Sequence, residues 1–138
     1  MIQKDSENVV TREIKEKLGK EIIKCRGEMS QRKLAKAVGL PPSNMKYIED
    51  GVNAPSYKVY AKIIDVLNPT RKQLALMDKL YSKIRKSPPP DVCKIINNNP
   101  ELFDSFRVLE GQILSKMQIT KAKELFESFV FENIKGSN

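Results

Sequence analysis

The side chains best suited to chemistry in this chain form a polar run on one face of a short predicted helix. Met45 and Ile48 are spaced as residues that point inward from one helix. The outward positions between and beside them then carry only polar or cationic groups: Ser43, Asn44, Lys46 and Tyr47. Hydroxyl, amide and ammonium groups in this arrangement can donate hydrogen bonds to base edges and phosphates in a DNA groove.

A second short helix must position this face. Leu34, Ala35 and Val38 have helical spacing, and the small Ala35 side chain lets another helix approach closely. Ser30 is a good N-cap for this helix. Gly39 follows the last apolar residue, where a left-handed backbone conformation costs least without a Cβ atom. The sequence therefore predicts that the helix ends there.

The turn that follows should open the polar helix. Pro41 and Pro42 cannot continue a helix but suit its first turn, where an N–H group would lack a partner, so we expect the helix to begin at about Pro42. Leu40 packs in the turn and Gly51 ends the helix. Two helices joined by a turn of three to four residues that contains Gly are typical of helix-turn-helix DNA binders.

The segment resembles the Xre/Cro-type helix-turn-helix family, the fold of the lambdoid phage repressors. It keeps eight positions of that family's pattern at the same offsets: Ser30, Gln31, Leu34, Ala35, Gly39, Leu40, Glu49 and Gly51. The likeness extends over Thr11–Cys25 and Ser56–Leu67, so it covers about the first half of the chain. It implies an all-α protein with a five-helix repressor-type domain that acts as a dimeric repressor on a palindromic operator in double-stranded DNA, as in phages and mobile elements.

The resemblance also implies roles for individual residues. Base contacts are expected from Pro42, Ser43, Lys46 and Tyr47, and backbone contacts from Gln31, Asn44, Asn53, Tyr57 and Lys58. Pro42 departs from the family pattern because its side chain forms no hydrogen bond, so it can at most touch a thymine methyl group. Gln31 is expected both to bind a phosphate and to brace the recognition helix at about 42–50.

Glu49 has a structural role in the resemblance, since a carboxylate at the end of a DNA-reading helix would repel phosphate. Family members pair this glutamate with a basic residue of the first helix, and Lys24 holds the corresponding position. We therefore expect a partly buried Lys24–Glu49 ion pair that fixes the angle between the two helices.

The basic residues are concentrated in the first part of the chain. Residues 1–87 contain 19 Lys and Arg against 10 Asp and Glu, whereas residues 88–138 contain 6 against 7. A uniformly lysine-rich solvated surface would not produce this asymmetry. Neutralisation of phosphates supplies much of the affinity for DNA, so the distribution favours a DNA-binding part beside an interaction part.

The remaining helices divide the chain into two regions. A helix from an N-cap at Thr11, one after Ser56 and one over Thr70–Arg85 complete a domain of residues 8–86. The prolines of residues 87–90 form a linker that no helix crosses. Residues 91–138 are expected to form a helical extension, with helices over Asp91–Asn97, Glu101 to about Ile113 and Thr120 to about Asn133.

The extension carries more apolar surface than some fifty residues can bury on themselves. We expect it to pack on the fifth helix or on a second subunit, and we favour a homodimer. The candidate interface residues are Phe103, Phe106, Leu109, Leu125, Phe126 and Phe129. Residues 68–85 are an alternative dimer surface, since some members of the family dimerise through the DNA-binding domain.

The sequence gives little support for catalysis or metal binding. The chain has no His and 2 Cys, and neither Cys has a CxxC partner or a His with which to share a metal, so we expect a non-enzyme with no metal or cofactor. Cys25 and Cys93 are interpreted as small apolar residues rather than a disulfide. Met1 to Glu7 is polar and no apolar run could span a membrane, so we expect a protein of the bacterial cytoplasm or of a phage-infected host.

Two other functions remain open at this stage. The protein could be an antitoxin or similar regulator whose C-terminal helices bind a protein partner, with DNA binding used for autoregulation. It could also be a basic scaffold or an RNA-binding module, because binding through charge alone produces the same composition.

Overall fold

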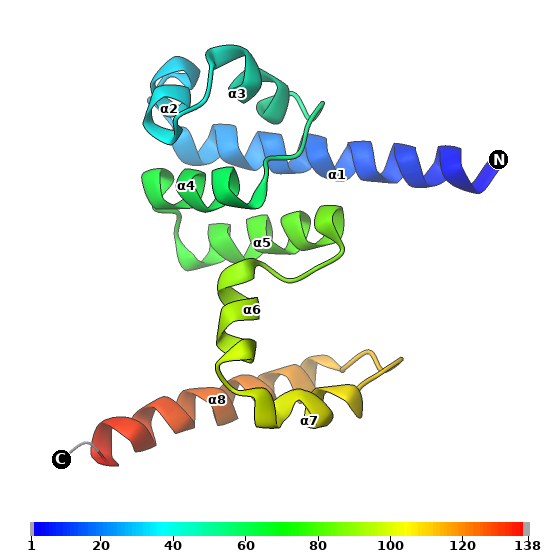
Figure 1. The fold of residues 1–138 in the computed structure, drawn as a ribbon, viewed down its shortest axis with the longest axis vertical. Helices are drawn as coiled ribbons and strands as arrows, with labels where there is room; N and C mark the ends of the chain where they lie inside the picture. Colours follow the sequence, from blue (N-terminus) through cyan, green and yellow to red (C-terminus); the bar gives the residue numbers. More distant parts are fainter. Residues whose placement is uncertain (1, 137–138) are drawn as a thin grey trace. The chain divides into compact units, whose positions relative to one another are not determined.

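The computed structural model describes residues 2–136, and the side chains of residues 9–136. Within this range the chain forms helices, turns and loops and contains no strand. It separates into two compact units, Met1–Asn97 and Asn98–Asn138 (Figure 1). The expectation of an all-α protein is confirmed.

Six helices form the first unit. They are α1 (Ile2–Arg26), α2 (Gln31–Val38), α3 (Pro42–Glu49), α4 (Tyr57–Leu67), α5 (Arg71–Arg85) and α6 (Pro90–Asn97). Helix α1 packs against α5 and α3, while α2 packs against α3 and α4. One apolar core lies between them, made of Leu18, Ile22, Leu34, Ala35, Val38, Met45, Ile48, Tyr60, Ile63, Met77, Leu80 and Tyr81.

The turn between α2 and α3 has the predicted form. The Ser30 hydroxyl accepts a hydrogen bond from the N–H of Lys33 at 3.1 Å, as expected of an N-cap. Gly39 adopts a left-handed conformation with φ of 78°, and the N–H of Leu40 bonds to the carbonyl of Ala35 at 2.8 Å. Helix α3 then begins at Pro42, also as predicted.

The first helix is longer than expected. The structure begins α1 at Ile2, so Thr11 lies inside the helix and is not its N-cap. No Pro or Gly interrupts residues 2–18, and the chain therefore continues the helix past the predicted start. Leu18 and Ile22, four residues apart, are buried and mark the inward stripe of α1.

Capping residues and one partly buried hydrogen bond position the next two helices, α4 and α5. Ser56 caps α4, as predicted. Thr70, the predicted first residue of the next helix, is the N-cap of α5 and forms a reciprocal capping box with Gln73. The Tyr60 hydroxyl donates to Asp78 at 2.7 Å. Burial, aided by this hydrogen bond, raises the pKa of Tyr60, and burial also raises the pKa of Asp78. The bond thus joins α4 to α5 beside the core.

The second unit differs in two places from the predicted helices. The expected helix from Glu101 to about Ile113 is only a 3-10 turn (Pro100–Leu102) and α7 (Phe103–Arg107). It stops because tight turns follow, with Gly111 at φ of 73°. Helix α8 (Lys116–Gly136) starts four residues before the predicted Thr120. Ser115 and Gln118 cap it reciprocally, at 2.9 and 3.2 Å.

The two compact units meet at Asn97–Asn98, so α6, which follows the prolines of residues 87–90, lies in the first unit. No side chain of residues 98–136 is buried. Cys25 and Cys93 are free thiols, each half-buried, and Cys25 Sγ lies 3.8 Å from Met77 Sδ. Among the described helices, none has an apolar stretch long enough to cross a lipid bilayer.

Candidate nucleic-acid interface

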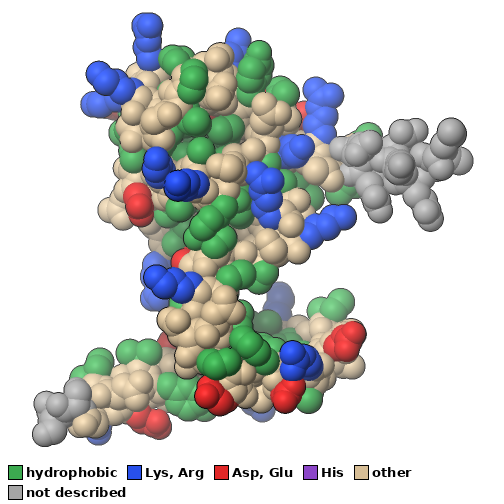
Figure 2. All heavy atoms as spheres, in the orientation of Figure 1, with side chains coloured by type: hydrophobic (Ala, Val, Ile, Leu, Met, Phe, Trp, Pro, Cys, Tyr) green, Lys and Arg blue, Asp and Glu red, His purple; other side chains and the backbone are tan. Residues whose placement is uncertain are grey.

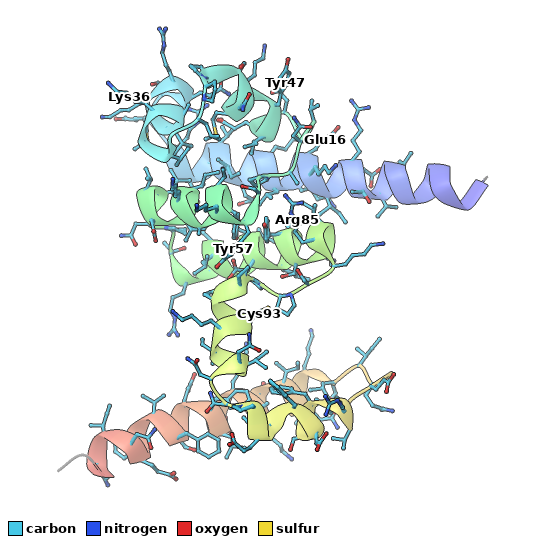
Figure 3. The ribbon with its side chains drawn as sticks, viewed as in Figure 1. Glu16, Lys36, Tyr47, Tyr57, Arg85 and Cys93 are labelled. Atoms are coloured by element: carbon cyan, nitrogen blue, oxygen red, sulfur yellow. The ribbon has the colours of Figure 1, made fainter. Side chains whose placement is uncertain are left out.

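The outward face of α3 carries the polar run read from the sequence. Met45 and Ile48 are buried on the inner face. The four outward residues, Ser43, Asn44, Lys46 and Tyr47, are exposed, as is Pro42 in the first turn. Tyr47 keeps 47% of its surface accessible, and Figure 3 shows it at the outer side of the first unit. The face therefore offers a hydroxyl, an amide, an ammonium and a phenol to an external partner.

A buried ion pair holds α3 against the end of α1. Arg26 Nε donates to the two carboxylate oxygens of Glu49 at 2.6 and 3.2 Å, and the Glu49 side chain is fully buried. Gln31 Nε2 donates to the same carboxylate at 3.2 Å. Arg26 Nη1 also donates to the carbonyl of Met29 at 2.8 Å. One carboxylate thus joins α1, α2 and α3, and fixes the direction in which α3 presents its outer face.

The expected Lys24–Glu49 pair is wrong. Lys24 is exposed and contacts Glu21 at 3.3 Å on its own helix. Residues two apart on a helix point about 200° apart, so Lys24 and Arg26 cannot face the same neighbour. Arg26 follows Ile22 by four residues and lies on the inward stripe, which makes it the partner of Glu49.

Hydrogen bonds fix both ends of the loop between α3 and α4. The N–H groups of Val52 and Asn53 both donate to the carbonyl of Tyr47, at 2.9 and 3.3 Å. Arg85 of α5 donates to the carbonyls of Pro55 and Ala54. Since the backbone N–H of Asn53 is already used, its exposed side-chain amide is the group that can donate to an external ligand.

A hollow of about 520 Å³ brings two predicted backbone contacts together. Asn44 of α3 and Asn53 of the loop line it with Lys15 and Thr11 of α1. Ser56 and Arg85 complete its polar lining. Amide, hydroxyl and cationic groups around one concave surface next to the outer face of α3 are suited to phosphate oxygens.

A second hollow lies beside the turn between α2 and α3 and is lined by basic residues. Arg32, Lys33 and Lys36 of α2 line it together with Pro42, and its volume is about 560 Å³. All three basic side chains are exposed, and Lys36 is labelled in Figure 3. The outer face of α3 is therefore bordered by cations on both sides.

Tyr57 lies apart from these residues. It lines hollows with Tyr81, Pro90 and Asp91, on the side of α5 and α6. Partial desolvation, followed by the charge of Asp91, raises the pKa of the Tyr57 phenol. Lys58, next in the chain, is exposed in the first turn of α4. The structure therefore groups Gln31, Asn44 and Asn53 with the α3 face but does not group Tyr57 with it.

The electrostatic character of this surface is positive. Figure 2 shows many Lys and Arg side chains and few acidic ones over the visible face of the first unit. The described ion pairs involve few of these cations: Arg12 with Glu16, Lys24 with Glu21 and Arg26 with Glu49 in this unit. Uncompensated positive charge of this kind attracts polyanions over a range of about 10 Å at moderate salt.

Four cations beside the face are not among the sequence-predicted contacts: Lys15, Arg32, Lys33 and Lys36. The sequence does contain a signal for Lys15. Lys15 lies one turn before Gly19, the residue on which α3 packs, and on the same side of α1, so it points toward the loop after α3. Arg85, which holds the loop, had no signal in the sequence. Searches against protein-family models, curated proteins and solved structures gave no match for this chain.

Proposed function

We propose that the protein is a sequence-specific regulator that binds double-stranded DNA through α3, as a dimeric repressor of the Xre/Cro type. The observation that carries this proposal is the outer face of α3, which is polar and exposed while a buried carboxylate fixes its direction. In this proposal α1 to α5 form the five-helix repressor-type domain, and α2 and α3 form its helix-turn-helix.

The α3 helix has the dimensions and the chemistry for the major groove. A single α-helix fits this groove, where each base pair presents its own pattern of donors and acceptors. Lys46 can donate to guanine O6 or N7, and the hydroxyls of Ser43 and Tyr47 can serve as donor or acceptor. Pro42 offers only an apolar contact. These residues would read sequence.

The flanking groups would set affinity and register. Asn44 and Asn53 on one side, with Lys15, can bind phosphates through the polar hollow. On the other side, Arg32, Lys33 and Lys36 surround the basic hollow. The Gln31 amide nitrogen carries two hydrogens, and one of them is used by Glu49, so the other remains suited to a phosphate.

Selection of bound sequences from random duplex DNA, followed by footprinting, tests the proposal. We expect a protected site with two-fold symmetry and half-sites about one helical turn, roughly 34–36 Å, apart. Equal recovery of all sequences would contradict it.

Lys46→Ala should then remove the preference at one base position of each half-site. The expected loss is about 1–3 kcal/mol per contact at that position, because a good base contact is lost while the fold is not disturbed. Lys79→Ala, which removes an exposed lysine of α5, is the matched control and should leave the selected sequence unchanged. Uniform weakening on all sequences would assign Lys46 to a phosphate.

A second function is favoured by the C-terminal unit. Leu125, Phe126 and Phe129 each expose about half of their surface, and no side chain of residues 98–136 is buried. An antitoxin or similar regulator would cover such a surface with a protein partner and use DNA binding for autoregulation. Copurification of a second protein in a fixed ratio would favour this function.

A further inference from the structure

Helix α8 carries a continuous apolar stripe that is about half exposed within the C-terminal unit. The stripe follows helical spacing and consists of Ile119, Ala122, Leu125, Phe126, Phe129 and Val130. Its large side chains are 41–62% exposed. A surface of this kind needs a partner helix, and the charges beside the stripe indicate which one.

Those charges are distributed by sign along the helix. Lys121 and Lys123 lie in the first half, and Glu127 and Glu132 lie in the second. On a helical projection Lys123 and Glu127 border one edge of the stripe, and Lys121 and Glu132 border the other. Each edge is therefore positive toward the N-terminus and negative toward the C-terminus.

Two of these charges are too far apart to pair within one helix. Lys121 and Glu132 are eleven residues apart, about 16 Å along the helix. Lys123 and Glu127 have the i, i+4 spacing that allows a pair within the helix, but these two described residues form none. No ion pair within the described part of the chain involves the Lys or Glu residues of α8.

We propose that α8 pairs with α8 of a second copy of this chain in an antiparallel arrangement. In an antiparallel pair each edge faces the same edge of its partner, reversed in direction. Lys123 then faces Glu127 of the other copy, and Lys121 faces Glu132. Both pairs are centred between residues 125 and 127, so Phe126 lies at or beside the two-fold axis. A parallel pair would instead set lysines beside lysines and glutamates beside glutamates.

The proposal specifies the dimer that the proposed repressor requires, and in that sense it rests on the proposed function. The self-complementary charges favour a second copy over an unrelated protein, because a foreign partner would need no such symmetry in this helix. Pairing of α8 would also bury the apolar stripe, whose side chains remain about half exposed in the single chain.

Charge reversal in the full-length chain tests the pairing. K121E/K123E makes both edges acidic, and E127K/E132K makes both edges basic. We expect the wild type to be a dimer by light scattering and sedimentation equilibrium, and each variant to dimerise about tenfold or more weakly, because like charges then face each other. A 1:1 mixture of the two variants should restore the dimer as a heterodimer.

The control variant reverses charges away from the stripe. Glu124 and Lys135 lie on the opposite side of α8, so E124K/K135E should dimerise as the wild type does. A monomeric wild type, or double reversals that dimerise as tightly as the wild type, would overturn the proposal, as would a fixed ratio of a foreign protein on α8 in place of a second copy.

Spin labels determine the orientation directly. In a Cys25→Ala/Cys93→Ala background, antiparallel pairing about Phe126 predicts label separations along the helix axis of about 6 Å for Ser128→Cys and about 27 Å for Lys135→Cys. Equal separations at the two positions would indicate parallel pairing and overturn the proposal.

The DNA selection described above is independent of these outcomes. An operator read by α3 together with reversals that leave the dimer intact would overturn only the α8 pairing. A dimer broken by the reversals in a protein without sequence preference would overturn only the proposed function.

Discussion

Glu49→Ala is expected to lower the free energy of unfolding by about 3–5 kcal/mol, the usual effect of removing one partner from a buried ion pair. The substitution leaves the guanidinium of Arg26 without its carboxylate, and the Arg26 side chain is only 18% exposed. It also removes the acceptor of the Gln31 amide. Urea denaturation monitored by circular dichroism measures the loss.

Asp50→Ala is the matched control for this change. Asp50 is the next residue and also a carboxylate, but it is exposed, so its removal should alter stability by no more than about 0.5 kcal/mol. Equal urea midpoints for the two variants would show that the Arg26–Glu49 pair does not hold α3 on α1.

Gly19→Ala is expected to have the next largest effect. A Cβ atom at Gly19 would lie 2.1 Å from the carbonyl oxygen of Glu49 and 2.9 Å from that of Ile48. Both obstacles are backbone atoms at the end of α3, which cannot move aside as a flexible side chain does. We therefore expect α1 and α3 to move apart. The free energy of unfolding should fall by about 3 kcal/mol, which is at the upper end of the usual range for overpacked sites.

Gly136→Ala makes the same substitution in a helix with open space around the new methyl group. It should not destabilise, since alanine is the better helix former. Thermal melts of the two variants beside the wild type make the comparison. A melting temperature of Gly19→Ala equal to that of the wild type would contradict the close approach of α1 and α3.

Local signals in the sequence predicted the first unit well. Ser30, Ser56 and Thr70 act as N-caps, and Gly39 ends α2, because capping depends on residues within one turn of the helix end. Apolar spacing also predicted the buried faces of α2 and α3 correctly. These features need no knowledge of the distant parts of the chain.

The differences between the predicted and the observed structure also have specific causes. The start of α1 was misplaced because Thr11 can cap a helix but can also continue one, and nothing before it stops the helix. The start of α8 was misplaced although Ser115 and Gln118 have capping-box spacing. The Lys24 pairing was transferred from the family pattern, whereas the spacing from Ile22 to Arg26 indicates the correct partner.

The candidate site was predictable in its centre and less so at its borders. The outward residues of α3 follow from periodicity, so they could be named from the sequence. Lys15 and Arg85 join them through contacts between helices distant in the chain. Tyr57 is expected to contact the DNA backbone, but it lines hollows with Tyr81 of α5 and Asp91 of α6, which are distant from it in the chain.

Competition titration tests sequence-specific DNA binding most directly. At about 0.15 M salt it compares the affinity of the chain for the selected duplex with its affinities for random duplex and for RNA of equal length. We expect the full-length chain to bind the selected duplex about a thousandfold or more tightly than either competitor. Equal affinity for all three would contradict the proposed regulator and leave a protein that binds polyanions by charge alone.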